Sequence, residues 1–335
     1  MKLSLLDRSR TRAGETDGAA LRHSVDRAVA AEAAGYHRFW VAEHHAVPGI
    51  ASGAPGVLLA AVGAATSTIR LGSGGVMLPH HQPLVVAEQF LMLEALYAGR
   101  VDVGLGRSPA FTAPVRAAMR EDSVDSLGGV SLGADSFEAD LAELRSYFDG
   151  TAAVTARPAA DTSREPIPMF VLATGKGIEV AARGGFPVVL GGPVLDRPGL
   201  ADLLSAYRRD FRPHAAAMDA PRVTVSLDVT IAGTDAEARE LALPEAWAMA
   251  RARQSGSFPA LESIAAIRDR HWSRQVTERV ERSLDRAVAG TAGTVRRRLE
   301  EIAERTGAEE LLASTSTFDR EALLASDREL ARLLS

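Results

Sequence analysis

Short apolar segments alternate with amphipathic segments along the chain. Each apolar segment carries few charged residues, which is typical of a strand with both faces buried in a parallel sheet. The pattern predicts eight strands, at Lys2–Leu6, Phe39–Ala42, Ile69–Gly72, Val101–Gly104, Met169–Leu172, Pro187–Leu190, Arg222–Ile231 and Glu310–Ala313.

Helical patterns lie between these strands. The first predicted helix has Asp17 as its N-cap, Leu21 and Val25 on its apolar face, and Gly35 at its end. The others are predicted at Pro55–Ala65, Pro83–Tyr97, Phe137–Phe148, Gly177–Arg183, Pro198–Phe211, Asp235–Arg253, Thr294–Arg305 and Arg320–Leu334.

Eight strands that alternate with helices predict an α/β fold, a (β/α)8 TIM barrel that forms one domain over residues 1–335. A doubly wound sheet is the alternative, and it would need a glycine-rich phosphate turn after the first strand. The segment Asp7-Arg8-Ser9-Arg10 stands there instead.

Two connections are longer than ordinary loops. Arg107–Asp135 follows the fourth strand, and Arg253–Thr291 belongs to the connection after the seventh. In a barrel, insertions at the carboxyl ends of strands cover the active site. We expect both to be lids that are mobile when no ligand is bound.

Composition narrows the function classes. The chain has no cysteine, which excludes disulfides, thiolate metal sites and a cysteine nucleophile. Its net charge of −5 and its scattered arginines give no basic face for nucleic acid. No signal peptide is visible, and the uncharged stretch His44–Ile69 is broken by Pro and Gly, so we expect a cytoplasmic protein with no membrane helix.

Two motifs follow neighbouring strands, Glu43-His44-His45 after the second and Ser73-Gly74-Gly75 after the third. Imidazole titrates near neutral pH and can act as base, acid or hydrogen-bond donor. A glycine pair leaves bare backbone that a flat ligand can approach, or it simply forms a turn with positive φ. Since adjacent residues of an extended strand point to opposite sides, we expect one histidine to face the site and the other to be packed or solvated.

A metal site is a further alternative, because Glu43, His44, His45, His80 and His81 could cluster. Adjacent histidines rarely bind the same ion, and no acidic residue stands out after the later strands. We therefore predict no metal.

An anion site is predicted between the fourth and fifth strands. Arg107 follows the fourth strand, and its planar guanidinium suits a phosphate. Thr174-Gly175-Lys176-Gly177 follows the fifth strand and opens a helix, where N–H groups, the helix dipole, a hydroxyl and Lys176 can bind an anion. The spacing is too short for a Walker A loop. A plain helix N-cap with a solvated lysine is the alternative.

Four stretches of the chain resemble the bacterial-luciferase-like flavin monooxygenase family. The similarity is to its single-chain oxidoreductases, some of which modify antibiotics such as aromatic polyketides. The stretches are Gly35–His45, Ile69–Pro79, Pro83–Gln89 and Leu93–Arg107, with weaker similarity over Phe170–Pro187 and Gly293–Phe318.

The resemblance implies an enzyme that binds FMN as a dissociable substrate, in the form FMNH2 delivered by a separate flavin reductase. In the family, the reduced flavin reacts with O2 at its C4a carbon, and the peroxide oxidises a small molecule, here expected to be hydrophobic. A homodimer is also implied.

The resemblance also assigns roles to residues. His44 corresponds to the catalytic histidine beside the flavin, and Glu43 lies near the ring. Ser73-Gly74-Gly75 falls where the family often has a non-proline cis peptide against the flavin. Arg107 matches a phosphate-binding arginine, and Thr174, Gly175 and Lys176 match the phosphate loop.

Two departures make luminescence doubtful, Gly106 in place of a cysteine of light-emitting members and Gln82 in place of a histidine. The nearest rival function is a deazaflavin (F420)-dependent dehydrogenase or reductase on the same barrel. A flavin-binding protein without activity and a metal hydrolase that uses the histidine cluster are further rivals. The sequence leaves open the substrate and the choice between hydroxylation, epoxidation and Baeyer–Villiger insertion.

Overall fold

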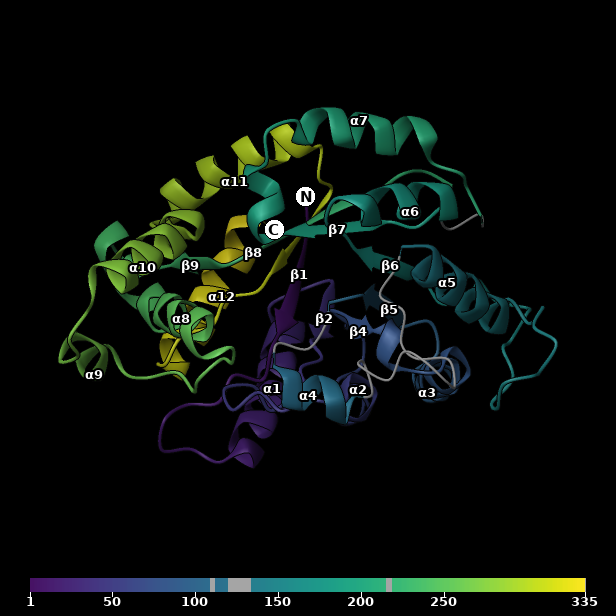
Figure 1. The fold of residues 1–335 in the computed structure, drawn as a ribbon, viewed down its shortest axis with the longest axis horizontal. Coiled ribbons are helices and arrows are strands. Elements are labelled where there is room, and N and C mark those ends of the chain that lie inside the picture. Colours follow the sequence, from purple (N-terminus) through teal and green to yellow (C-terminus); the bar gives the residue numbers. More distant parts are fainter. Residues whose placement is uncertain (109–111, 120–133, 215–218, 335) are drawn as a thin grey trace.

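The computed structural model describes residues 1–108, 112–119, 134–214 and 219–334. Strands lie at the centre of the molecule with helices around them (Figure 1). Eight parallel strands pair in the order β3-β2-β1-β11-β8-β7-β6-β5, and β3 pairs with β5 to close the barrel. The predicted (β/α)8 barrel is therefore confirmed. Its strands are β1 Lys2–Asp7, β2 Arg38–Val41, β3 Arg70–Ser73, β5 Val101–Gly106, β6 Met169–Leu172, β7 Val188–Gly191, β8 Val223–Leu227 and β11 Glu310–Ala313.

Three short strands add to this barrel. β4 (Val76–Met77) pairs with β5, and β9 (Val229–Ile231) pairs in parallel with β10 (Val288–Gly290) outside the barrel sheet. The single strand predicted over Arg222–Ile231 is therefore wrong. The chain leaves the barrel at Asp228, because the backbone beyond that residue pairs with β10 and no longer with the barrel strands.

The helices that follow the barrel strands lie close to their predicted positions. Thr16, and not Asp17, is the N-cap of the first helix, since its hydroxyl accepts a hydrogen bond from the Ala19 amide at 3.2 Å. Gly35 follows the end of that helix with φ of +86°, as predicted. The helices are α1 Asp17–Ala33, α2 Pro55–Ala65, α3 Pro83–Leu96, α5 Ala134–Phe148, α6 Lys176–Gly184, α7 Leu200–Asp210, α11 Ala292–Thr306 and α12 Arg320–Leu334.

Alternate residues of the strands face different layers. Leu5 and Phe39 are fully buried in the large core, which also includes residues of the surrounding helices. Leu6 and Trp40 belong to a separate buried cluster with Phe170, Val189 and Leu312. Trp40 occupies this cluster edge-on to Phe170, with ring centroids 5.1 Å apart.

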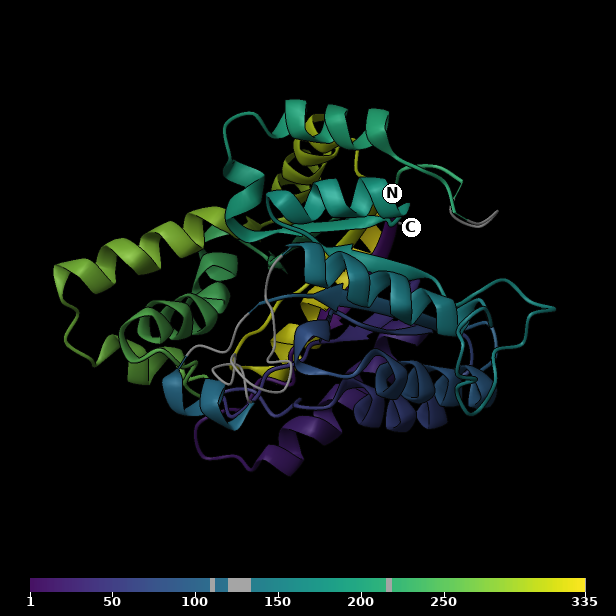
Figure 2. The same cartoon turned by 45° about the vertical axis from the view of Figure 1, so that its right-hand side comes forward.

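The insertion after β8 forms a helical lobe beside the barrel (Figures 1 and 2). It contains α8 (Asp235–Ser255), α9 (Ile264–Arg268) and α10 (Arg274–Arg286). Trp247 of α8 and Val280 of α10 are buried in a small core that α8, α9 and α10 share. The predicted insertion after the seventh strand is thus confirmed.

The insertion after the fourth strand is described only in part. It includes the short helix α4 (Ala113–Ala118), whereas residues 109–111 and 120–133 lie outside the described residues, and so does the predicted mobility of that lid. Among the helices that the structure describes, none combines the length and apolar character needed to cross a membrane.

Candidate active site

A cavity of about 1240 Å³ opens at the carboxyl ends of the barrel strands. Its volume exceeds the roughly 300–1,000 Å³ typical of ligand pockets, which leaves room for more than one molecule. Six barrel strands contribute residues at or just beyond their carboxyl ends: Leu6 and Arg8, Gly106 and Arg107, Leu172 to Thr174, Val189 and Gly191, Ser226 to Asp228, and Leu312 and Ser314. The location matches that of active sites in this fold.

The floor of the cavity is apolar, and one side is formed by helices. Leu6, Leu172, Val189 and Leu312 belong to the buried cluster around Trp40, and each also lines the cavity. Helices α8, α10 and α11 supply the wall on the side of the insertion. A flat organic molecule can therefore rest on apolar side chains beneath a more polar wall.

Arg107 and Thr174 bring polar groups to the same cavity from the ends of β5 and β6. Thr174 immediately precedes Gly175, the N-cap of α6, whose φ of +55° favours glycine. Helix α6 has no side-chain cap, and the positive end of its dipole is available to an anion. The amides of Gly177 and Ile178 already donate to Thr174 O and Gly175 O, at 3.2 and 3.1 Å. Gly177 of its first turn lines the cavity, whereas the described cavity lining does not include Gly175 or the exposed Lys176.

Glu43 is a buried carboxylate that follows β2 and is 3% exposed. Its Oε1 lies 2.8 Å from Nε2 of His45 and 2.8 Å from Nε2 of His81, and its Oε2 accepts the Met77 amide at 3.3 Å. Burial raises the pKa of Glu43, but the hydrogen bonds from His45 and His81 outweigh it, and the pKa falls to about 2. Glu43 is therefore ionised and holds both rings in place.

The same cluster could hold a metal ion. Glu43, His45 and His80 each offer one ligand atom, and these atoms lie within 4.8 Å of one another. Carboxylate and imidazole are ligands that zinc accepts. His44, which the sequence placed among the candidate ligands, is not part of this set.

His44 lies in the loop after β2, and its ring contacts a residue of the insertion after β8. The ring meets Phe258 edge-on with centroids 6.2 Å apart, and the backbone amide donates to Ser52 O. Burial lowers the pKa of His44, the charges of Arg8 and Arg10 lower it further, and it reaches about 4. His44 is therefore neutral at pH 7. Its Nδ1 is buried and has no hydrogen-bond partner among the described residues.

The peptide bond between Gly74 and Gly75 is cis, as the family resemblance predicts. Both glycines are buried. A Cβ on Gly74 would lie 2.5 Å from Leu6 Cδ1, and one on Gly75 would lie 2.7 Å from Gly104 O. The glycines are thus required for close approach of backbone and side chains, and Leu6 rather than the glycine pair lines the cavity.

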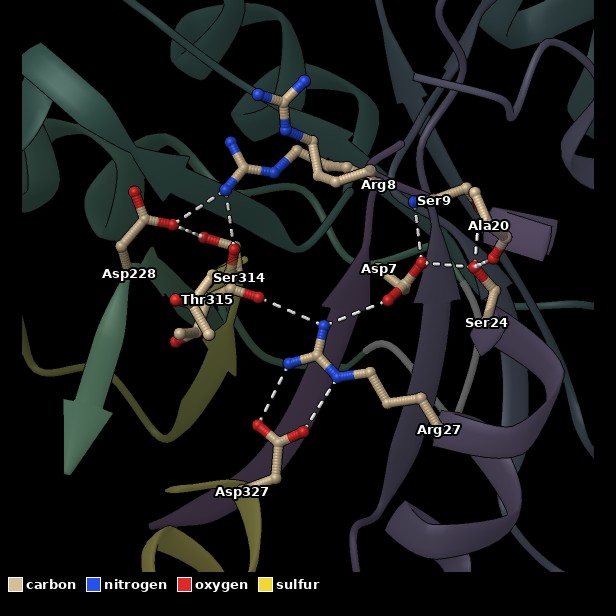
Figure 3. Close-up of polar contacts among 12 residues, drawn as sticks. Asp7, Arg8, Ser9, Ala20, Ser24, Arg27, Asp228, Ser314, Thr315 and Asp327 are labelled. Carbon is tan, nitrogen blue, oxygen red and sulfur yellow. Dashed lines mark hydrogen bonds and ion pairs between the residues drawn. The ribbon is translucent and has the colours of Figure 1, made fainter. Parts of the chain in front are cut away.

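Arg8, Asp228 and Ser314 form a polar group on the cavity wall (Figure 3). Arg8 Nη2 donates to Asp228 Oδ1 at 3.0 Å and to Ser314 O at 2.7 Å, and Ser314 Oγ donates to Asp228 Oδ1 at 2.9 Å. Burial raises the pKa of Asp228, Arg8 lowers it and Glu245 raises it, which leaves the pKa above its usual value. Arg8 also lies 3.2 Å from Glu245.

Comparison with known proteins identifies the family. The model of the luciferase-like monooxygenase family matches residues 1–310. The chain belongs to the luciferase-like monooxygenase family. A luciferase-like monooxygenase of Escherichia coli K12 is 34% identical over 327 residues, which cover 96% of this chain and 94% of that protein.

Solved structures agree with this membership. The crystal structure of apo-MsnO8 is 33% identical, has a TM-score of 0.84, and covers 99% of this chain and 98% of its own. Two structures show the fold alone. The FMN complex of the oxygenating constituent of 3,6-diketocamphane monooxygenase of Pseudomonas putida is 17% identical (TM-score 0.72, covering 99% and 97% of the chains). An F420-dependent secondary alcohol dehydrogenase is 15% identical (TM-score 0.70, covering 100% and 99%).

In this luciferase-like monooxygenase, the cavity brings together two of the residues that the sequence placed in the site, Arg107 and Thr174. The others are not among its lining residues: Glu43, His44, Ser73, Gly74, Gly75, Gly175 and Lys176. His44 lies near enough to the cavity-lining Arg8 for the arginine to lower its pKa. The sequence analysis missed Arg8 and Asp228. The one signal that could have found Asp228 is an acidic residue inside the apolar run Arg222–Ile231.

Proposed function

We propose that this luciferase-like monooxygenase uses FMNH2 and O2 to oxidise an organic substrate in the cavity at the carboxyl ends of the strands. The observation that supports this most is one large cavity with an anion-binding end at Arg107 and Thr174 and an apolar floor around Leu6 and Leu172. A flavin mononucleotide has the same two parts, an anionic tail and a flat ring.

The residues present fit this cofactor. Arg107, the hydroxyl of Thr174 and the positive end of the α6 dipole would hold the phosphate. The ring would extend over the apolar floor toward Arg8, and the volume leaves space for a substrate beside it. When bound, reduced FMN supplies the electrons that activate O2.

The protein supplies position and dryness. The apolar floor excludes water, which slows side reactions of a reactive cofactor. His44 is neutral at pH 7 and has a buried ring nitrogen, so its role is that of a hydrogen-bonding imidazole more than of a strong base. We also propose that the flavin ring contacts His44, Glu43 and the backbone of Gly74 and Gly75. Leu6 or Arg8 would have to move aside for this contact.

The same proposal includes a source of reduced flavin, a cellular compartment and an oligomeric state. A separate flavin reductase delivers FMNH2 by diffusion, the enzyme works in the cytoplasm, and it forms a homodimer. Oxidation of a polyketide or another secondary metabolite is the setting that the family resemblance suggests.

An F420-dependent dehydrogenase is the second candidate, because an enzyme of that kind shares the fold. Identity favours the monooxygenase: the chain is 34% identical to a luciferase-like monooxygenase and 15% identical to the dehydrogenase. Anaerobic mixing with FMNH2 or with reduced F420, followed by a pulse of O2, separates the two. We expect rapid O2 uptake with FMNH2. Hydride transfer from reduced F420 without O2 uptake would contradict the proposal.

The role of His44 is tested by His44→Ala. We expect this variant to bind FMN within about threefold of wild type and to release H2O2 in place of oxygenated product, with product per O2 consumed at least about tenfold lower. The measurement is simultaneous O2 and H2O2 quantification during FMNH2 turnover.

His23→Ala is the matched control, since His23 lies on α1 and is not part of the cavity. We expect it to keep the product yield of wild type. Full product formation by His44→Ala would remove His44 from the reaction.

A further inference from the structure

Arginines crowd the wall of the cavity that helices α8, α10 and α11 form. The arginines on this wall come from α8, α10 and α11, and they are Arg253, Arg279, Arg282, Arg286, Arg298 and Arg305.

Most of the acidic residues that line the cavity are already paired. Asp196 lies 2.8 Å from Arg286, Asp228 lies 3.0 Å from Arg8, and Asp285 lies 3.2 Å from Arg239. Glu301 is the remaining acidic residue of the described lining. It cannot neutralise the arginines that are left.

Five of the wall arginines have no carboxylate within ion-pair distance in the described part of the chain, and we call them the arginine face: Arg253, Arg279, Arg282, Arg298 and Arg305. Arg279 and Arg298 are half-buried, and the other three are exposed. Nη1 of Arg279 is also buried and lacks a hydrogen-bond partner among the described residues. A buried guanidinium nitrogen without an acceptor is unfavourable. The arrangement therefore indicates an acceptor that comes from a ligand.

Arginines elsewhere on the same lobe are paired. Arg239 pairs with Glu281, Arg268 with Glu240, Arg270 with Glu262 and Arg274 with Glu278. Lack of a carboxylate partner is thus no general property of this arginine-rich segment.

Helical spacing explains why the arginines point one way. Arg279, Arg282 and Arg286 are spaced i, i+3, i+7 and share one face of α10. Val276, Val280 and Leu284 form a separate, buried face, which packs in the small core with α8. Burial of the valine and leucine face therefore directs the arginines to the cavity.

We propose that the arginine face binds the acidic group of the substrate, and that the substrate is an organic acid with an apolar body. This rests on the proposed function, which assigns Arg107 and Thr174 to the flavin phosphate. The apolar floor at Leu172, Val189 and Leu312 then receives the body of the substrate, next to the space that the flavin ring occupies. An apolar molecule without charge would leave the buried Nη1 of Arg279 unsatisfied.

The experiment measures binding by calorimetry to the full chain saturated with FMN, with octanoate as the acidic probe and octanamide as its neutral match. We expect octanoate to bind at least about tenfold more tightly than octanamide, the factor that one charge-assisted hydrogen bond supplies. Arg279→Gln/Arg282→Gln should remove this preference and leave octanamide binding unchanged. Arg274→Gln, on the outer face of the same helix, should behave as wild type.

A charge-reversal variant distinguishes loss of the binding site from misfolding of the protein. Arg279→Glu/Arg282→Glu should reject octanoate and bind octylamine more tightly than wild type does, at least about tenfold, which an unfolded protein cannot do. Equal affinity of wild type for octanoate and octanamide would overturn the proposal.

FMN affinity, followed by flavin fluorescence, distinguishes the two possible anions. If the glutamine variant loses FMN affinity, and inorganic phosphate competes with octanoate, the arginine face binds the flavin phosphate and the proposal is wrong. Because these measurements do not need turnover, failure of O2 uptake would contradict the proposed function without changing this outcome.

Discussion

Glu43 shows how one buried carboxylate organises a group of rings. The sequence marked Glu43-His44-His45 as a unit and placed the chemistry on the histidines. In the structure, Glu43 is the residue that binds two rings, while His44 faces a different environment. The motif therefore indicated a group of interacting side chains after the second strand. It could not indicate that Glu43 is the central residue, because the second ring that Glu43 binds, His81, comes after a different strand.

His44 should make stability depend on pH. Its pKa of about 4 lies below the usual 6.5, so the unfolded chain binds more protons between these values. The free energy of unfolding should therefore fall as the pH drops from about 6.5 to 4, by on the order of 3 kcal/mol from this group. His44→Gln should lack that decrease, as urea unfolding at pH 7, 5.5 and 4.5 would show.

The difference between wild type and variant isolates His44 from other titrating groups. Glu43, with a pKa of about 2 against the usual 4.5, acts at lower pH, where its stabilising contribution is lost. His23 and His37 also have lowered pKa values, and they contribute equally to both proteins. Parallel curves for wild type and His44→Gln would mean that the imidazole is not held neutral.

Among the strands and helices, the break between β8 and β9 could not be predicted from the sequence pattern. The apolar run Arg222–Ile231 predicts one strand, because alternation of side chains says nothing about pairing partners. The second half pairs instead with β10, a strand too short to be recognised. That switch leaves Asp228 at the cavity wall, where Arg8 binds it.

Arg27 of α1 connects this helix to β1 and to α12 through ion pairs. Its guanidinium binds Asp327 of α12 through Nε at 2.8 Å and Nη2 at 3.0 Å, and Asp7 at 3.0 Å through Nη1 (Figure 3). Arg27→Met would leave Asp7 and Asp327 buried without their cation. We expect the free energy of unfolding to fall by about 3–5 kcal/mol.

Chemical denaturation measures this loss, with Arg22→Met as the control. Arg22 lies on the exposed side of the same helix, so its replacement should change stability by less than about 0.5 kcal/mol. A loss below about 1 kcal/mol for Arg27→Met would show that the three-way contact does not hold α1 and α12 in place.

At the scale of the whole molecule, the order of strands and helices was predictable and the cavity lining was not. Strand ends follow from local apolar runs, so Arg107 and Thr174 could be placed at one rim. The lining depends on which side chains fill the barrel. Leu6 covers Gly74, and Trp40 takes the space that Gly72 leaves free: a Cβ there would lie 2.2 Å from Trp40 Nε1. Such packing involves residues far apart in sequence.

The outer surface of α2 and α3 is a candidate contact surface for the expected homodimer. Val57 of α2 is 75% exposed, and Met92 and Leu96 of α3 are 53% and 65% exposed. The two helices pack closely, since a Cβ at Gly63 of α2 would lie 2.4 Å from the ring of Tyr97, which ends α3. Exposed apolar side chains on two packed helices are of the kind that marks interaction sites.

We predict that this surface forms the dimer contact and that Met92→Glu/Leu96→Glu yields a monomer, because a charge buried against its own copy is repelled and desolvated. Light scattering after size exclusion measures the mass. Val154→Glu, an equally exposed apolar position (58%) outside both helices, should remain dimeric. The cavity lies at the carboxyl ends of the strands and not on this surface, so the monomer should still bind FMN. A monomeric wild type at micromolar concentration, or a dimeric Met92→Glu/Leu96→Glu variant, would place the contact elsewhere or exclude it.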